Sequence, residues 1–95
     1  MSEANSVCSS ALTRTVRAAS TLHARPAAHL VQAVQSFDAK LVLLRGKTRA
    51  DAKSILDILA LSIQEGDWLV LEASGTDAGA ALEVLAGLFT SGFKG

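Results

Sequence analysis

The chain has 95 residues, and its nine basic and nine acidic residues give a formal net charge of zero. This length suits one domain with a modest core, which the 49% of apolar residues can build without disulfides or metals. The balanced charge and the scarcity of aromatic residues argue against nucleic-acid binding, and no apolar run is long enough to span a bilayer.

The N-terminal residues are small and polar. Residues 1–10 lack the charged and apolar regions of a secretion signal. The only cysteine, Cys8, has no partner for a disulfide or a zinc motif. We therefore expect a cytoplasmic protein with a flexible tail over residues 1–11.

The pattern of the first half of the chain predicts a strand, a helix and a hairpin. Alternating Thr and Val indicate a strand over residues 12–18. A second strand is expected over 39–45, followed by a turn at Gly46–Lys47 and a short strand near 47–50. Between the first two strands lies a helix that begins near Pro26, where a missing N–H is tolerated. Its apolar stripe has helical spacing and comprises Ala27, Leu30, Val31, Val34 and Phe37.

The second half alternates helix, strand and helix. Ser54 opens a short helix over 54–61, and Ser54 with Asp57 has the spacing of a capping box, with Asp in place of Glu. A turn over 65–67 leads to a strand over 68–73. Helical spacing returns over 78–89, and residues 91–95 are expected to fray.

The element order βαββαβα predicts an α+β fold, with one mainly antiparallel sheet that carries helices on one face. Side chains expected to face the helices are Val16, Leu41, Leu43, Leu69 and Leu71. Those expected on the other face are Thr15, Arg17, Lys40, Val42, Trp68, Val70 and Glu72. This outer face has an apolar cluster that indicates either a contact surface or a partly covered sheet, formed by Val42, Leu44, Trp68 and Val70.

One segment, residues 22–28, places a histidine and an arginine beside the expected start of a helix, an arrangement able to hold a phosphate. Imidazole titrates close to neutral pH, so His23 can serve as a nucleophile there. The N-terminus of the following helix offers free N–H groups and a positive dipole end to an anion. The planar guanidinium of Arg25 can hydrogen-bond to the oxygens of the same anion. A lone histidine at a helix start is by itself more often a surface residue, so the motif needs further support.

That support comes from a second motif. The sequence LHARPAA at 22–28 is followed by a helix and, about thirty residues later, by KSILDILAL at 53–61. Together they resemble HPr, the histidine-containing phosphocarrier family of the bacterial phosphoenolpyruvate-dependent sugar phosphotransferase system. The resemblance covers roughly residues 13–89. It implies an open-faced β-sandwich of four antiparallel strands and three helices, as an HPr-like domain over 12–90.

The resemblance also implies roles for single residues. His23 would accept a phosphoryl group on Nδ1 from phosphorylated enzyme I and pass it to IIA domains, and Arg25 would steady the phosphohistidine. Ser54 matches a serine that a dedicated ATP-dependent kinase phosphorylates in many bacteria. The matching partner surface comprises Ala24, Ala28, Lys53, Ile55, Leu56 and Leu59.

The implied protein is a carrier rather than a turnover enzyme. It needs no cofactor, because phosphoenolpyruvate and Mg²⁺ are used by enzyme I. Further implied partners are a serine kinase/phosphorylase and transcription regulators, where the cell has them. We expect no nucleic-acid partner, no metal and no membrane insertion.

The sequence departs from the family at several positions. Thr21 replaces a common Gly before Leu-His, which predicts a stiffer or differently turned loop. Ser20 stands where an Asn often supports the histidine. Gln32 and Gln35 replace residues that are often basic, and Asp57 adds an acid to the docking helix, so the surface is less positive.

Three other readings stay open at this point. A paralogous carrier of a nitrogen-related phosphorelay would look the same at His23 and Arg25. A pure interaction module regulated at Ser54 would not need His23. A metal or enzyme site is disfavoured, because His23 and His29 do not share a helical face and no Cys or acidic cluster joins them.

Overall fold

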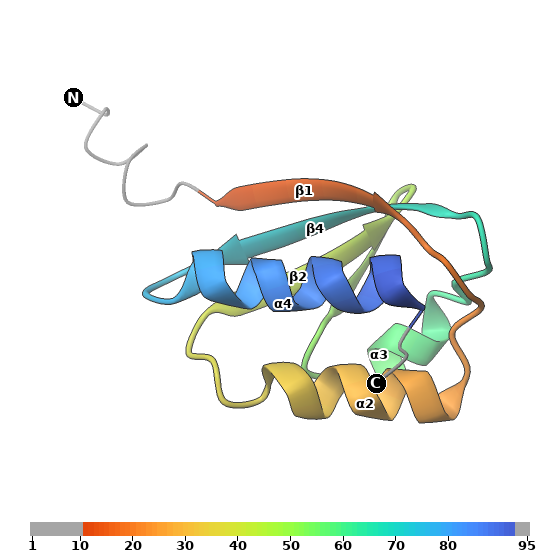
Figure 1. Ribbon diagram of the computed structural model, residues 1–95, viewed down its shortest axis with the longest axis horizontal. Helices are drawn as coiled ribbons and strands as arrows, with labels where there is room; N and C mark the ends of the chain where they lie inside the picture. The colour runs from red at the N-terminus through yellow and green to blue at the C-terminus, as the bar shows by residue number, and fades with distance from the viewer. Residues whose placement is uncertain (1–10, 93–95) are drawn as a thin grey trace.

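The computed structural model describes residues 11–92, and Figure 1 shows a sheet with its helices gathered on one side. The order βαββαβα is confirmed. The elements are β1 (Leu12–Arg17), α2 (Ala24–Val34), β2 (Lys40–Arg45), β3 (Thr48–Asp51), α3 (Ile55–Ala60), β4 (Trp68–Ser74) and α4 (Ala78–Ser91).

The four strands form one sheet in the order β1-β4-β2-β3, and every neighbouring pair is antiparallel. The register places Val16 opposite Leu69, and Leu71 opposite Leu43. Side chains alternate between the two faces of a strand, so these four point to the same side. The predicted open-faced α+β fold is confirmed.

The core lies between this inner face and the helices. It is aliphatic, apart from Phe89, and no polar or charged side chain among the described residues is buried. Burial of apolar side chains is the main favourable term in the free energy of folding. The largest fully buried side chains are Phe89, Leu30, Leu41, Leu43, Ile58, Ile63, Leu69, Leu71, Leu85 and Val34.

The outer face of the sheet is open, as expected, but one of the side chains that the alternation assigned to it is buried. Trp68 and Val70 are exposed, with 63% and 36% of their surfaces accessible. Val42 was expected to face water and is only 8% exposed, although it lies outside the main core cluster. Its cross-strand neighbours are Asp51 and Glu72, on the two strands that flank β2.

The element ends differ slightly from the sequence-based bounds. The third strand covers 48–51 rather than 47–50, because Gly46 adopts a left-handed turn conformation with φ 62°. Ser91 belongs to α4 rather than to a frayed tail, and Gly92 ends that helix with φ 71°, as C-terminal glycines commonly do. The rest of the expected tails, residues 1–10 and 93–95, lies outside the described residues.

Candidate functional site

His23 is the N-cap residue of α2. Its backbone is extended, with φ −96° and ψ −173°, and its carbonyl accepts the N–H of Ala27 at 3.0 Å. Its side chain makes no capping hydrogen bond and is exposed. The imidazole is therefore placed at the helix start without being used to hold the helix.

The first turn of α2 leaves donors beside this imidazole. The N–H groups of Ala24 and Arg25 have no acceptor within the helix, because the first helical residues lack one. Pro26 follows at the third position and has no N–H to satisfy. Arg25 is exposed and forms no ion pair with any residue in 11–92. His23 is thus followed directly in the chain by two amides without a helical acceptor, at a positive helix end, and by the exposed Arg25.

The segment that leads to His23, residues 18–22, is hydrogen-bonded to the loop that follows α3. The N–H of Leu22 donates to the carbonyl of Ile63 at 3.0 Å, and the N–H of Glu65 donates to the hydroxyl of Thr21 at 3.1 Å. Ala18 exchanges two backbone bonds with this loop, to Gly66 at 2.8 Å and to Asp67 at 2.9 Å. The predicted effect of Thr21 thus has a structural counterpart, since its hydroxyl adds a bond that glycine cannot make.

Asp67 in turn holds this loop in shape. Its carboxylate accepts the N–H of Gln64 at 2.8 Å and Nε of Arg45 at 2.7 Å. These two hydrogen bonds keep the pKa of the Asp67 carboxyl below its ordinary value of 3.8. Arg45 also donates to the carbonyl of Leu61 at 3.3 Å. The sequence signalled only a turn at 65–67, and these long-range bonds were missed.

Ser20 does not support His23 in the way its position suggested. Its hydroxyl donates to the carbonyl of Gly92 at 3.5 Å, and the N–H of Ala19 donates to the carbonyl of Phe89 at 3.2 Å. Both bonds join the approach segment to the C-terminal end of α4. Ser20 therefore contributes to the placing of the segment rather than to the imidazole.

Ser54 is the N-cap of α3, and its hydroxyl accepts the N–H of Asp57 at 3.3 Å. The reciprocal half of the predicted capping box is absent. The N–H of Ser54 instead donates to the carbonyl of Asp51 at 3.0 Å, and the Asp57 carboxylate accepts the N–H of Asp51 at 3.3 Å. Ser54 is half-buried, and its backbone N–H and its hydroxyl bond to the backbones of two acidic residues, Asp51 and Asp57.

Lys53 has a structural position that the sequence did not reveal. Its ammonium donates to the carbonyl of Phe37, and its own carbonyl accepts Nε2 of Gln35 at 3.3 Å. The start of α3 thus lies against the end of α2, while Ile63, just after α3, lies beside Leu22. Lys53 is thus bonded to residues at the C-terminal end of α2, whereas His23 caps the N-terminal end.

The other expected partner-binding residues fall into two groups. Leu56 is 75% exposed, the highest value among the large apolar side chains described, and Ala24 is exposed at the helix start. Ile55 and Leu59 are half-buried and pack against the core, and Ala28 is also half-buried. Leu56 therefore offers the most accessible apolar contact on α3.

Residues 11–92 contain no group of three or more His, Cys, Asp or Glu side chains that could hold a metal ion. Within the same range, every helix is too short or too polar to cross a bilayer.

Comparison of the sequence and the fold with known proteins identifies the family of this chain. The family model described as "PTS HPr component phosphorylation site" matches residues 12–91. The chain belongs to the HPr family. It is thus a phosphocarrier of the phosphotransferase system. Members of the HPr family carry the phosphoryl group on a histidine and act as carriers rather than as turnover enzymes.

Individual relatives agree with this assignment. The chain is 42% identical to phosphocarrier protein HPr of Treponema pallidum over 77% of its length and 83% of the relative. It is 38% identical to phosphocarrier protein NPr of Escherichia coli K12, over 76% and 81%. A crystal structure of HPr from Bacillus anthracis matches with a TM-score of 0.80 and 33% identity, covering 84% of this chain and 98% of that one.

Proposed function

We propose that His23 accepts a phosphoryl group from phosphorylated enzyme I and passes it to the IIA domains of sugar transporters. The observation that carries this is the exposed imidazole at the N-cap of α2, which makes no capping bond. The amides of Ala24 and Arg25, which have no acceptor within the helix, and the positive helix end support the proposal, because such groups favour a phosphate.

The chemistry is an in-line exchange between two carriers. A neutral ring nitrogen of His23, Nδ1 by family resemblance, attacks phosphorus as the bond to the donor group breaks, and the reverse step delivers the group to the acceptor. Charge is spread over the three equatorial oxygens during transfer. The Arg25 guanidinium and the helix end offer positive charge to these oxygens. Because His23 is exposed, donor and acceptor proteins can both reach it.

Intact-mass measurement tests the acceptor. The protein is mixed with phosphoenolpyruvate, Mg²⁺ and an enzyme I, and the label is checked for acid lability. One acid-labile phosphate that is lost in His23→Ala supports the proposal. The matched control is His29→Ala, because His29 is a second exposed histidine on α2 and lies outside the first turn. Labelling of His23→Ala, or no labelling of the wild type, would refute it.

We propose the sugar-type circuit rather than a nitrogen-type one, and the relatives include both an HPr with 42% identity and an NPr with 38% identity. The test is a competition in which equal amounts of sugar-type and nitrogen-type enzyme I compete to phosphorylate the chain. Faster labelling by the sugar-type enzyme and onward transfer to a sugar IIA domain support this choice. Faster labelling by the nitrogen-type enzyme reverses the choice and leaves His23 as the acceptor.

We also propose that phosphorylation of Ser54 regulates docking. A phosphate adds about −1.5 to −2 charge, and here it would stand at the start of α3, on a residue bonded to Asp51 and Asp57 and two residues before the exposed Leu56. Such charge would repel an acidic partner that packs on α3. Ser54→Asp should raise the KM for phospho-enzyme I and Ser54→Ala should not. An unchanged KM in Ser54→Asp would count against the regulation, while leaving the His23 proposal intact.

A further inference from the structure

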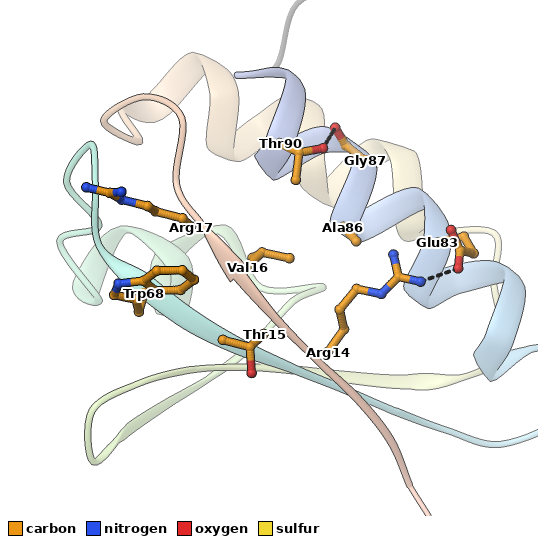
Figure 2. Close-up of a pocket in the computed structure, with 9 residues that line it drawn as sticks. All are labelled: Arg14, Thr15, Val16, Arg17, Trp68, Glu83, Ala86, Gly87 and Thr90. Atoms are coloured by element: carbon orange, nitrogen blue, oxygen red, sulfur yellow. Dashed lines mark hydrogen bonds and ion pairs between the residues drawn. The ribbon is translucent and has the colours of Figure 1, made fainter.

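A groove runs along the edge of the sheet, between β1 and α4 (Figure 2). Its volume is about 460 Å³, and Arg14, Val16 and Arg17 of β1 line one side. Volumes of roughly 300–1,000 Å³ are usual for binding sites. In Figure 2 the Arg17–Trp68 pair lies at one end and the Arg14–Glu83 pair at the other, with Val16 between them.

The floor of the groove is an unpaired strand edge. β1 pairs with β4 on one side only, and it is the first strand in the sheet order. Every second residue of an edge strand therefore points its N–H and C=O away from the sheet. Within residues 11–92, no further strand satisfies these groups. Such an edge pairs readily with an extended segment of another chain.

The helical wall of the groove leaves room for such a segment. Glu83, Ala86, Gly87 and Thr90 occupy one face of α4 at helical spacing. The central two are the smallest residues available. A Cβ placed on Gly87 would have no heavy atom within 4 Å beyond its own neighbourhood. Side chains of an added strand could therefore enter the space between β1 and α4.

The charges in the groove select for an acidic segment. Arg14 is paired with Glu83. Arg17 has no carboxylate partner in the described part of the chain, because its Nε donates to the carbonyl of Gly66 at 3.3 Å and its guanidinium lies 5.8 Å from the Trp68 ring centre. The two terminal nitrogens of Arg17 are thus held in place and available to a carboxylate.

We propose that this groove binds an extended acidic segment of a partner protein, which adds to the sheet as a fifth strand beside β1. An acidic side chain lies next to Arg17 and Trp68 on the outer face. Its neighbour in sequence is apolar and points between Val16 and Gly87, because consecutive side chains of a strand alternate faces. A second copy of this chain is disfavoured as the occupant, since its own β1 would bring two more arginines to the edge.

Occupation of the groove leaves the phosphoryl site open. None of the residues that line the groove belongs to α2 or to α3. A partner held there could therefore remain bound while His23 is exposed to a donor and an acceptor. This surface is independent of the proposed phosphoryl transfer, so each can fail without the other.

The probe is the capped heptapeptide Ser-Glu-Val-Glu-Val-Glu-Ser, titrated into ¹⁵N-labelled full-length protein and followed by NMR. We expect shifts for β1 amides, for the Trp68 indole N–H and for residues 83–90. Replacing Glu by Gln in the peptide should weaken binding by about fivefold or more. N-methylation of one alternate set of peptide amides should abolish binding, whereas methylation of the other set should not.

Two protein variants locate the binding. Arg17→Gln should weaken binding about fivefold. Gly87→Leu, whose Cβ would meet no heavy atom within 4 Å, places a large side chain in the groove and should abolish binding, whereas the helix variant Gly79→Leu, outside the groove, should not. The proposal is overturned by shifts centred on α2 and α3, by full binding to Gly87→Leu, or by no shifts at about 5 mM peptide. Peptide-independent dimerisation through β1 would overturn it in favour of a second copy.

Discussion

Glu65 donates its backbone N–H to the hydroxyl of Thr21 at 3.1 Å, which joins the loop after α3 to the segment that carries His23. This bond spans 44 positions of sequence. Together with the bonds of Ala18 and Leu22, it places the histidine by backbone contacts rather than by contacts to the imidazole.

Removing the Thr21 hydroxyl tests this support. Thr21→Val keeps the shape and leaves the Glu65 N–H without its acceptor, so unfolding should become easier by about 1 kcal/mol. Thermal denaturation measures the loss, and a rate of phosphorylation by enzyme I shows whether the loop matters for transfer. Thr13→Val is the control, because Thr13 is an exposed strand residue whose hydroxyl makes no hydrogen bond to any residue in 11–92. Equal stability of both variants would mean that the Thr21 bond contributes nothing.

Gly75 should tolerate alanine worse than Gly46 does. Gly75 has φ 113°, and an added Cβ would lie 3.3 Å from the backbone Cα of Ala39. Gly46 has φ 62° and open space around it. Gly75→Ala should therefore cost about 1–3 kcal/mol in unfolding free energy, and Gly46→Ala only about 1 kcal/mol. Urea denaturation of the two variants gives the comparison, and a smaller loss for Gly75→Ala would contradict it.

Acid should weaken the fold partly through Asp77. The carboxylate of Asp77 accepts the N–H groups of Asp38 at 2.9 Å and Ala39 at 2.8 Å. The bond from Asp38 above all lowers the pKa of Asp77 from its ordinary 3.8, against an opposing effect of desolvation. Because the folded pKa lies below the unfolded one, the unfolded chain binds more protons as pH falls through this range. The stabilisation is thus present above pH 3.8 and is lost below it.

Asp77→Asn isolates this contribution. The variant should be less stable than wild type near neutral pH, and the difference should shrink as pH falls below about 4. Urea midpoints measured between neutral pH and pH 3 check the trend. Asp67→Asn should behave in the same direction, because the N–H of Gln64 and the Arg45 guanidinium lower the pKa of Asp67. A difference that stays constant with pH would show that the carboxylate charge is not responsible.

Leu56 should matter for docking and not for folding. Its side chain is 75% exposed, so Leu56→Ala should change stability by less than about 0.5 kcal/mol. If α3 docks enzyme I, the KM for phosphoryl transfer should rise about fivefold or more, with kcat little changed. Steady-state transfer assays separate the two. Val84→Ala on α4 is the control, and equal KM values for both variants would exclude Leu56 from the docking surface.

Sequence periodicity predicted the elements well because burial repeats with the period of each element. Leu41 and Leu43 face the core with the alternation of a strand, and Leu30 and Val34 with the spacing of a helix. His23 at a helix start followed from Pro26, whose restricted φ suits a first turn. The structure places His23 at the N-cap of α2, as that argument predicted. The roles of His23, Arg25 and Ser54 stay predictions.

Long-range hydrogen bonds were beyond the reach of such patterns. The contact of Lys53 with Phe37 spans 16 positions, and no periodicity connects these residues. The same holds for Arg45 and Asp67, which the hairpin and the turn bring together only after folding. The groove beside β1 was also not predictable, because it depends on where α4 settles against the sheet edge.

The packing of α3 against α2 sets how the surroundings of His23 and Ser54 are related. α2 has 11 residues, so its two ends lie about 16 Å apart, roughly twice the Debye length of about 8 Å at physiological salt. Charges at the two ends of this helix are therefore largely screened from one another. Lys53, the neighbour of Ser54 in sequence, is bonded to Gln35 and Phe37 at the C-terminal end of α2, whereas His23 caps the N-terminal end. A single partner that packs across both helices would contact the surroundings of both residues at once.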